Sequence, residues 1–296
     1  MKSKNTIGFA VSGIKRYEND YYINSPASFA AFSVTGAYCE CRCAHCDAGL
    51  LRSMADVSTT EKSISRVDKV LNAVCTGILV SGGADSGGRV PLLPHMDGIA
   101  YAKSKGLKVL VHTGLVDQET AYALKAANVD QVLMDVIGSE KTINSVYGID
   151  KKPEHYLNSL LYCKKADLKI APHIVIGLDY GKIDGEYNAI NLINRAEAEN
   201  LVLVVLVPKR GTKMAAITPP PLMEVIKVLR YAADTCKNSK IMLGCARPHS
   251  YSTELEKAAI DLGFNAIAYP REETVRYAQE LGLEAVFFEE CCCLVH

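Results

Sequence analysis

Three cysteines on one short loop constrain this chain more than any other feature. Cys39, Cys43 and Cys46 have the spacing C-x3-C-x2-C and follow an apolar run at 29–34 that the pattern predicts as a β-strand. Three thiolates on one tight loop can bind three irons of a cubic [4Fe–4S] cluster and leave the fourth iron open to a small molecule. A closed structural zinc site more often uses two distant C-x2-C pairs. The loop therefore predicts an iron–sulfur centre, with a zinc or disulfide loop as the alternative.

Composition excludes several classes of function. Lys plus Arg equals Asp plus Glu, at 33 each, so no overall field attracts nucleic acid or an anionic membrane. The longest apolar runs, such as 201–207, are too short to span a bilayer, and the N-terminus leads into no signal sequence. Eleven cysteines without an export signal favour thiolate ligands in a reducing cytoplasm over disulfides. We therefore expect a cytoplasmic protein that acts on neither nucleic acid nor membrane.

The chain alternates regularly between strand and helix patterns. Strands are predicted at 29–34, 77–81, 107–112, 131–135, 169–176, 202–207, 241–244 and 266–269. Helices are predicted between and after them at 60–74, 94–105, 117–127, 153–165, 185–199, 220–237, 253–262 and 272–281.

Eight strands, each followed by a helix, predict an α/β fold of the (β/α)8 TIM-barrel type. We expect a short N-terminal leader at 1–27, the barrel at 28–283 and a cysteine-rich C-terminal tail at 284–296. A doubly wound open sheet is the alternative fold. In a barrel of this type the site lies at the C-terminal ends of the strands, where most of the unusual residues of this chain fall.

The cysteine loop resembles that of the radical S-adenosylmethionine (SAM) superfamily, C-x3-C-x-aromatic-C, with His45 in the aromatic position. The glycine-rich segment 80–91 after the second predicted strand is similar to the superfamily's glycine motif. That resemblance implies that Gly82 and Gly83 hold the amino group of SAM through the backbone. The usual acidic third residue is replaced by Ala84, with Asp85 next. A simple glycine-rich turn is the alternative interpretation.

Polar residues stand at the ends of three further strands: His112, Asp135 and His173. Buried polar groups need partners, so each is either a satisfied core residue or a contact to SAM or substrate. Asp135 can bind the ribose or the amino group of SAM. The sequence leaves the general acid or base, if there is one, unassigned.

Two later segments extend the resemblance. Gly177 and the pair at 185–186 resemble the part of the superfamily fold that supports adenine. The stretch 208–212 is similar to the Pro-x-x-Gly-Thr stretch of the biotin-synthase branch, so Pro208 either lines the adenine pocket or leads to Lys209 and Arg210 as carboxylate partners. Together with the strand-end residues, the resemblance gives a candidate SAM-binding set of His45, Gly82, Gly83, Asp135, His173, Gly177 and Pro208.

The C-terminal cysteines predict a second metal centre. Cys291, Cys292 and Cys293 follow two glutamates, where burial as small apolar residues is a poor explanation. Cys245 follows the seventh predicted strand, and Cys41 lies inside the first motif but outside its register. Thiolates that converge on a barrel mouth suit a soft metal, so we predict a second iron–sulfur cluster held by some of these five. A metal-free or redox-active tail is the alternative.

Across residues 29–293 the chain resembles the archaeal-type two-component lipoyl synthases of the biotin-synthase group, on segments such as 32–40, 81–91 and 244–248. The resemblance implies a sulfur-inserting enzyme that uses a 5′-deoxyadenosyl radical on a protein-bound octanoyl-lysine. It also implies an octanoylated lipoyl-carrier protein, a paralogous radical-SAM subunit, and a reductant such as ferredoxin or flavodoxin as partners. Two other classes stay open: a radical-SAM mutase or methylase without sulfur insertion, and a non-catalytic iron–sulfur carrier or zinc scaffold.

Overall fold

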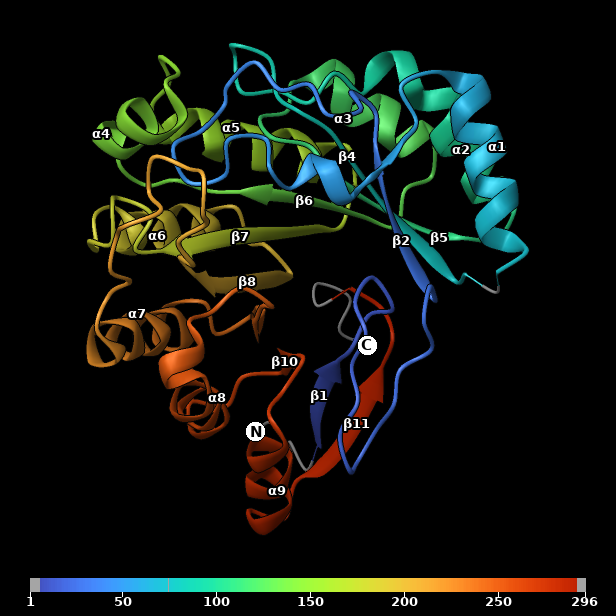
Figure 1. The fold of residues 1–296 in the computed structure, drawn as a ribbon. Helices are drawn as coiled ribbons and strands as arrows, with labels where there is room; N and C mark the ends of the chain where they lie inside the picture. The colour runs from blue at the N-terminus through green and yellow to red at the C-terminus, as the bar shows by residue number, and fades with distance from the viewer. Residues whose placement is uncertain (1–5, 74, 292–296) are drawn as a thin grey trace.

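The computed structural model describes residues 6–73 and 75–291, and one parallel β-sheet organises them (Figure 1). Its strands are β1 Thr6–Ala10, β2 Phe29–Ser33, β3 Ala55–Asp56, β4 Gly77–Ser81, β5 Lys108–His112, β6 Gln131–Asp135, β7 Ile170–Ile176, β8 Asn200–Val205, β9 Lys240–Leu243, β10 Ala266–Ala268 and β11 Glu284–Phe288. The α-helices are α1 Thr60–Leu71, α2 Met96–Ser104, α3 Gln118–Ala126, α4 Glu140–Thr142, α5 Pro153–Lys165, α6 Glu186–Arg195, α7 Leu222–Thr235, α8 Ser252–Asp261 and α9 Glu272–Glu280. Four short turns complete the set: η1 Leu51–Ser53, η2 Leu93–His95, the π-helical η3 Ile143–Tyr147 and η4 His249–Tyr251.

All the predicted strands are present as β2 and β4 to β10, and all the predicted helices are present, α5 with the predicted bounds and the others with ends shifted by a few residues. The strands were recognisable because they are covered on both faces, which produces nearly continuous apolar runs. Strand β6 is an example, since its first four residues are all buried. The helices lie along the outer side of the curved sheet (Figure 1). The α/β prediction is therefore confirmed.

The prediction of a complete (β/α)8 barrel is wrong in one respect, because the sheet does not close. The strand order is β11-β1-β10-β9-β8-β7-β6-β5-β4-β2-β3, and among the described residues β11 pairs with β1 alone. The free edge of β2 is taken by β3, through the pairs Phe32↔Ala55 and Ser33↔Asp56. From β4 to β10 the order follows the sequence without reversal, which rules out the doubly wound alternative. The result is a parallel sheet curled into a half-barrel.

Strands β1 and β11, which lie in the predicted leader and at the start of the predicted tail, both belong to the sheet. Strand β1 lies between β10 and β11, with the register pairs Gly8↔Ala266 and Thr6↔Glu284. The sequence concealed β1 because it is short and has a glycine at its centre. Strand β11 does contain a short apolar run, 285–288, but it lies directly before the cysteine-rich end of the chain, so the sequence pattern groups it with the C-terminal tail.

Side chains on the concave side of the sheet form a second core. We call this set the concave wall; its buried members, one from each of seven strands, are Phe29, Leu110, Leu133, Ala171, Val202, Met242 and Ala266. The partly buried residues packed against it are Leu79, Val204, Phe288 and Cys291. The interior of the half-barrel is therefore an apolar surface, and the segment after β11 lies against it.

Side-chain contacts, in place of a strand ladder, connect the segment after β11 to the other side of the sheet. Glu289 accepts hydrogen bonds from the backbone N–H of Ser25 at 2.8 Å and from the hydroxyl of Tyr22 at 3.0 Å. Glu290 forms an ion pair with Lys108, the first residue of β5. Lys108 and Leu110 are two positions apart in β5, so their side chains point to the same face of the sheet, the concave one. This segment therefore reaches across the open half-barrel.

Across the described residues, no helix has both the length and the apolar character that a membrane span requires.

Candidate functional site

The loop that carries the three motif cysteines is joined to the glycine-rich segment after β4. The backbone N–H of Glu40 donates to the carbonyl of Ala84 at 2.9 Å, and that of Gly83 donates to the Thr35 hydroxyl at 2.7 Å. The sulfur of Cys39 lies 3.8 Å from the same Ala84 carbonyl oxygen. The two segments, both predicted as parts of the site, therefore form one unit at the C-terminal ends of β2 and β4.

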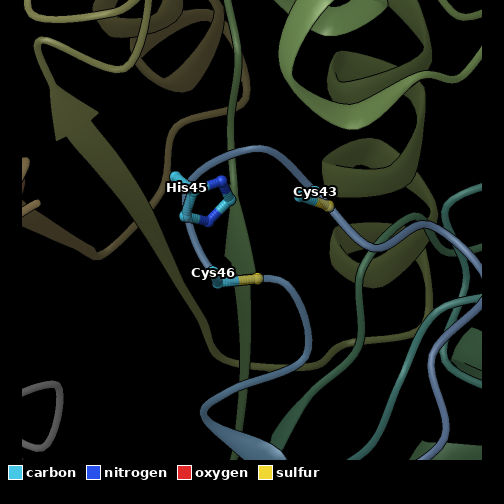
Figure 2. A group of neighbouring side chains, drawn as sticks. All are labelled: Cys43, His45 and Cys46. Carbon is cyan, nitrogen blue, oxygen red and sulfur yellow. The ribbon is translucent and has the colours of Figure 1, made fainter. Parts of the chain in front are cut away.

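The ligand atoms of Cys43, His45 and Cys46 all lie within 4.8 Å of one another (Figure 2). The backbone N–H of Cys46 donates to the carbonyl of Cys43 at 3.2 Å, which makes the tight turn that brings them together. A hydrogen bond from the Cys43 thiol and a smaller contribution from His45 together lower the pKa of Cys46 to about 4. Burial alone would raise this pKa, but its effect is smaller than that of the Cys43 hydrogen bond. The turn therefore stabilises a thiolate, the form of cysteine that binds iron.

The residues of this loop fit a [4Fe–4S] cluster. Cys39, Cys43 and Cys46 would hold it, since all three are on one loop and thiolate is the usual ligand of such clusters. Cys43 and Cys46 are already close together, while Cys39 faces the glycine-rich segment. Beside them, Nδ1 of His45 and the hydroxyl of Tyr147 are buried without a hydrogen-bond partner among the described residues. A polar group bound at this loop would satisfy them.

Gly83 packs against the backbone of the cysteine loop, so a side chain at this position would disturb the loop as well as any ligand bound there. A Cβ atom on Gly83 would lie 1.9 Å from the carbonyl oxygen of Tyr38 and 2.5 Å from the Cα of Cys39. A Gly83→Val substitution is therefore not a selective block of SAM binding that leaves the cluster in place, as the glycine motif alone suggests. The added side chain would displace Cys39 itself. Gly82 is also tightly packed, 2.9 Å from Val34 by the same measure.

We predict that Gly83→Ala lowers the iron content of the reconstituted protein by roughly half or more, because one cysteine ligand is moved away from the other two. Gly87→Ala is the matched control, since a Cβ there would meet only the side chain of Asp85, at 3.2 Å. Iron and sulfide analysis after anaerobic reconstitution provides the measurement. Equal iron in the two variants would show that the close contact at Gly83 is dispensable.

Asp85 and Cys41 have structural partners in the same region. The Asp85 carboxylate accepts hydrogen bonds from the backbone N–H groups of Gly87 and Arg89, each at 2.9 Å, so it closes the turn of the glycine-rich segment. The Cys41 thiol donates to the Asp85 carbonyl at 2.9 Å, and a hydrogen bond with Cys43 lowers its pKa. These contacts of Cys41 are therefore with the first motif and the glycine-rich segment.

The polar residues at the ends of β5, β6 and β7 come together on the concave side. Nε2 of His112 lies 3.6 Å from the Asp135 carboxylate, and the rings of His112 and His173 are 5.9 Å apart. Burial opposes ionisation of Asp135, but the hydrogen bond and charge of His112 outweigh it and lower the pKa of Asp135 to about 2. Burial and the neighbouring His112 lower the pKa of His173. The three residues therefore form one polar cluster, in which Asp135 and His112 favour each other's charged form and the surroundings of His173 disfavour its protonation.

Gly177 and Pro208 lie at the ends of the next two strands. The backbone N–H of Gly177 donates to the carboxylate of Glu186 at 2.8 Å, and the other carboxylate oxygen of Glu186 is buried without a partner in the described structure. Pro208 follows β8 and precedes Lys209. Burial lowers the pKa of Lys209, while the nearby thiols Cys46 and Cys245 raise it, so this ammonium group is within electrostatic reach of both.

Cys291 lies near enough to Cys245 to act on it electrostatically, whereas Cys292 and Cys293 lie outside the described residues. Cys245 follows β9 and is accessible to solvent, yet burial raises its pKa and the nearby Cys291 raises it further. Cys291 also acts electrostatically on His112 and His173. The structure therefore brings the thiol of the C-terminal segment to the side of the sheet that carries the strand-end polar residues.

A buried ion pair holds the loop that carries Cys245, and the sequence did not predict it. The Arg247 guanidinium donates to Glu256 at 2.9 Å and to the carbonyl oxygens of Gly244 and Ala268, each at 2.8 Å. Glu256 in α8 is fully buried and also accepts from the Thr274 hydroxyl at 2.6 Å. Removing one partner of such a pair typically costs about 3–5 kcal/mol, so the network fixes the ends of β9 and β10. The motif Gly-Cys-Ala-Arg-Pro at 244–248 was the only signal, and it does not reveal the partner.

Comparison with known proteins supports one superfamily. No family model matches the chain. Biotin synthase from Brucella ovis is 25% identical over 179 residues, which cover 60% of this chain and 53% of the relative. The chain thus spans about half the length of the curated relatives that it matches.

Solved structures share the fold. A structure of HydG, a maturase of the [FeFe]-hydrogenase, matches 98% of this chain and 66% of its own length, with a TM-score of 0.63 and 14% sequence identity. A structure of methylornithine synthase (PylB) matches 95% of this chain and 84% of its own length, with a TM-score of 0.59 and 13% sequence identity. The sequence likeness to biotin synthase, the shared fold and the cysteine loop together support assignment of this chain to the radical-SAM superfamily.

Proposed function

We propose that this chain is a radical-SAM enzyme that inserts sulfur into a protein-bound octanoyl-lysine, as a subunit of a lipoyl synthase of the two-component type. The observation that supports sulfur insertion most is that Cys291 packs against the concave wall while it also acts electrostatically on Cys245, a thiol from a distant part of the sequence. Two such thiols can supply ligands to a second iron–sulfur cluster as the sulfur store. Cys292 and Cys293 are the further candidate ligands.

In this proposal the motif loop and the strand ends have separate tasks. Cys39, Cys43 and Cys46 bind the first cluster, and His45, Gly82, Gly83, Asp135, His173, Gly177 and Pro208 bind SAM. Cluster and SAM together supply a 5′-deoxyadenosyl radical that abstracts hydrogen from an unactivated carbon. The His112–Asp135 ion pair orients a hydroxyl or amino group on the concave side.

The concave wall suits an alkyl chain. Its buried members are aliphatic or aromatic, apart from the thioether of Met242, and Leu79 and Val204 extend it toward the strand ends. An octanoyl chain bound there would be shielded from water, which protects a reactive carbon centre from side reactions. An octanoylated lipoyl-carrier protein would deliver the chain, with a paralogous radical-SAM subunit and a reductant such as ferredoxin or flavodoxin as further partners. We propose the cytoplasm as the location.

A radical-SAM mutase or methylase without sulfur insertion is the second candidate. The shared fold with methylornithine synthase, whose named product contains no sulfur, favours it. Such an enzyme needs only the first cluster, so the iron content distinguishes the two candidates.

The test is an anaerobic assay of the reconstituted full chain. The chain is incubated with SAM, dithionite and an octanoyl-lysine peptide, alone and with the paralogous subunit, and the products are analysed by mass spectrometry. Sulfur insertion predicts 5′-deoxyadenosine together with a thiolated octanoyl product. 5′-Deoxyadenosine with no thiolated product in either arm would favour the second candidate, and absence of SAM cleavage would favour a non-catalytic carrier.

A further inference from the structure

The hydroxyl of Tyr147 is a buried polar group beside the motif loop with no hydrogen-bond partner among the described residues. Its ring lies 5.4 Å from that of His45, whose Nδ1 is likewise unpaired. A buried hydroxyl without a partner costs about 1–3 kcal/mol, and a phenylalanine would fill the same space without that cost. The hydroxyl is therefore expected to contact a further group when the protein functions.

The local backbone directs Tyr147 at the motif loop. It is the last residue of η3, a π-helical turn that ends at Gly148 with a φ of 69°. Such turns are rare and occur frequently at functional sites. The backbone N–H of Ala44, between two motif cysteines, donates to the carbonyl of Val146 at 2.8 Å. The residue before Tyr147 is thus bonded directly to the loop that carries the cysteine ligands.

The groups around the hydroxyl are acceptors. Asp135, Cys43, Tyr156 and Cys46 all act electrostatically on Tyr147, and each of them is negative when ionised. Burial holds the pKa of Tyr147 well above its ordinary value, so the phenol keeps its proton and acts as a donor. Asp135 is already paired with His112. Of these four groups, Cys43 and Cys46 belong to the motif loop, to which the residue before Tyr147 is hydrogen-bonded, so their sulfurs are the acceptors that the local backbone favours.

We infer that Tyr147 is a positioning residue of the motif site, whose hydroxyl donates a hydrogen bond to the sulfur of Cys43 when that sulfur is an iron ligand. The inference rests on the proposed function, because it requires an iron–sulfur cluster at this loop. Hydrogen bonds to the sulfurs of a cluster help to set its reduction potential. A donor stabilises the more negative, reduced form, so Tyr147 raises the potential and makes the cluster easier to reduce.

The test compares wild type with Tyr147→Phe, which removes only the hydroxyl. Both proteins are reconstituted anaerobically with iron and sulfide, and the cluster is titrated with a reductant while its electron paramagnetic resonance signal is recorded. We expect the ratio of reduced to oxidised cluster at a fixed potential to fall up to tenfold in the variant, equivalent to about 59 mV for one electron. Iron content, SAM affinity and thermal stability should equal those of wild type.

Tyr251→Phe is the matched control, because it also removes one phenol hydroxyl, one that donates to the Pro220 carbonyl at 2.9 Å in the structure. Its cluster should titrate as wild type does. An unchanged potential in Tyr147→Phe with full iron overturns the inference, as does a loss of iron or a loss of SAM affinity at unchanged potential. A wild-type chain that binds no cluster refutes the proposed function as well, so the two failures are distinguishable.

Discussion

Replacement of Cys43 by alanine is expected to abolish reductive cleavage of SAM, with a fall of more than about 100-fold. Changes to residues that merely support metal ligands cost 10–100-fold, and this change removes a ligand itself. It also removes the hydrogen bond that lowers the pKa of Cys46 and so stabilises the thiolate there. The backbone turn should survive, because the 3.2 Å contact between Cys43 and Cys46 that forms it is made by main-chain atoms. The measurement is 5′-deoxyadenosine formed per chain under dithionite.

Cys163→Ala is the control for that experiment. Cys163 lies in α5, is completely buried, and has a pKa raised to about 12 by burial, so it is a packing residue. Its replacement should cost about 1 kcal/mol of unfolding free energy and leave SAM cleavage intact. Wild-type levels of 5′-deoxyadenosine from Cys43→Ala would contradict the radical-SAM assignment, since the motif loop would then have no role in the reaction.

The elements that could be predicted are those whose signal is local. Strands β4 and β6 have their predicted bounds because a buried strand between two helical layers must be apolar along its whole length. The cysteine motif was equally accessible, since ligand spacing on one loop depends on the backbone of that loop alone. Both signals are contained within a few consecutive residues.

Closure of the barrel could not be predicted, because it depends on which strands meet at the edges. Strand β3 has two residues, yet its pairing with Phe32 and Ser33 occupies the edge that closure requires. Strand β1 joins β10 through a register that begins at Gly8, which no local pattern encodes. Edge pairing is a property of the assembled sheet and leaves little trace in composition.

The same limit applies to the site. Tyr147 and Asp135 are twelve positions apart in the sequence, and only the π-helical turn brings the phenol toward the motif loop. Arg247 finds its partner Glu256 on the following helix, and a charged pair in a helix pattern usually indicates an exposed face. Residues that act by converging from separate elements were therefore recognised only in the structure.

Deletion of the residues after Glu290 is expected to remove roughly half of the iron while SAM cleavage persists, because two clusters of equal size would share the metal and only one would lose its ligands. The design leaves the described anchors in place, since Glu289 keeps its contacts to Ser25 and Tyr22, and Glu290 keeps its ion pair with Lys108. The truncated chain should form 5′-deoxyadenosine and no thiolated octanoyl product. Iron and sulfide analysis and mass spectrometry provide the two measurements.

Single substitutions separate a ligand role from a packing role of the C-terminal segment. Cys245→Ser should reproduce the loss of iron, because Cys245 lies on a different element and approaches Cys291 only in the fold. Cys236→Ser, at a buried thiol at the end of α7, should lower stability without that loss. Full iron and sulfide in the truncated chain would instead mean that the segment binds no cluster. Sulfur insertion would then lose its main structural support, and a mutase or methylase that uses the motif cluster alone would become the better assignment.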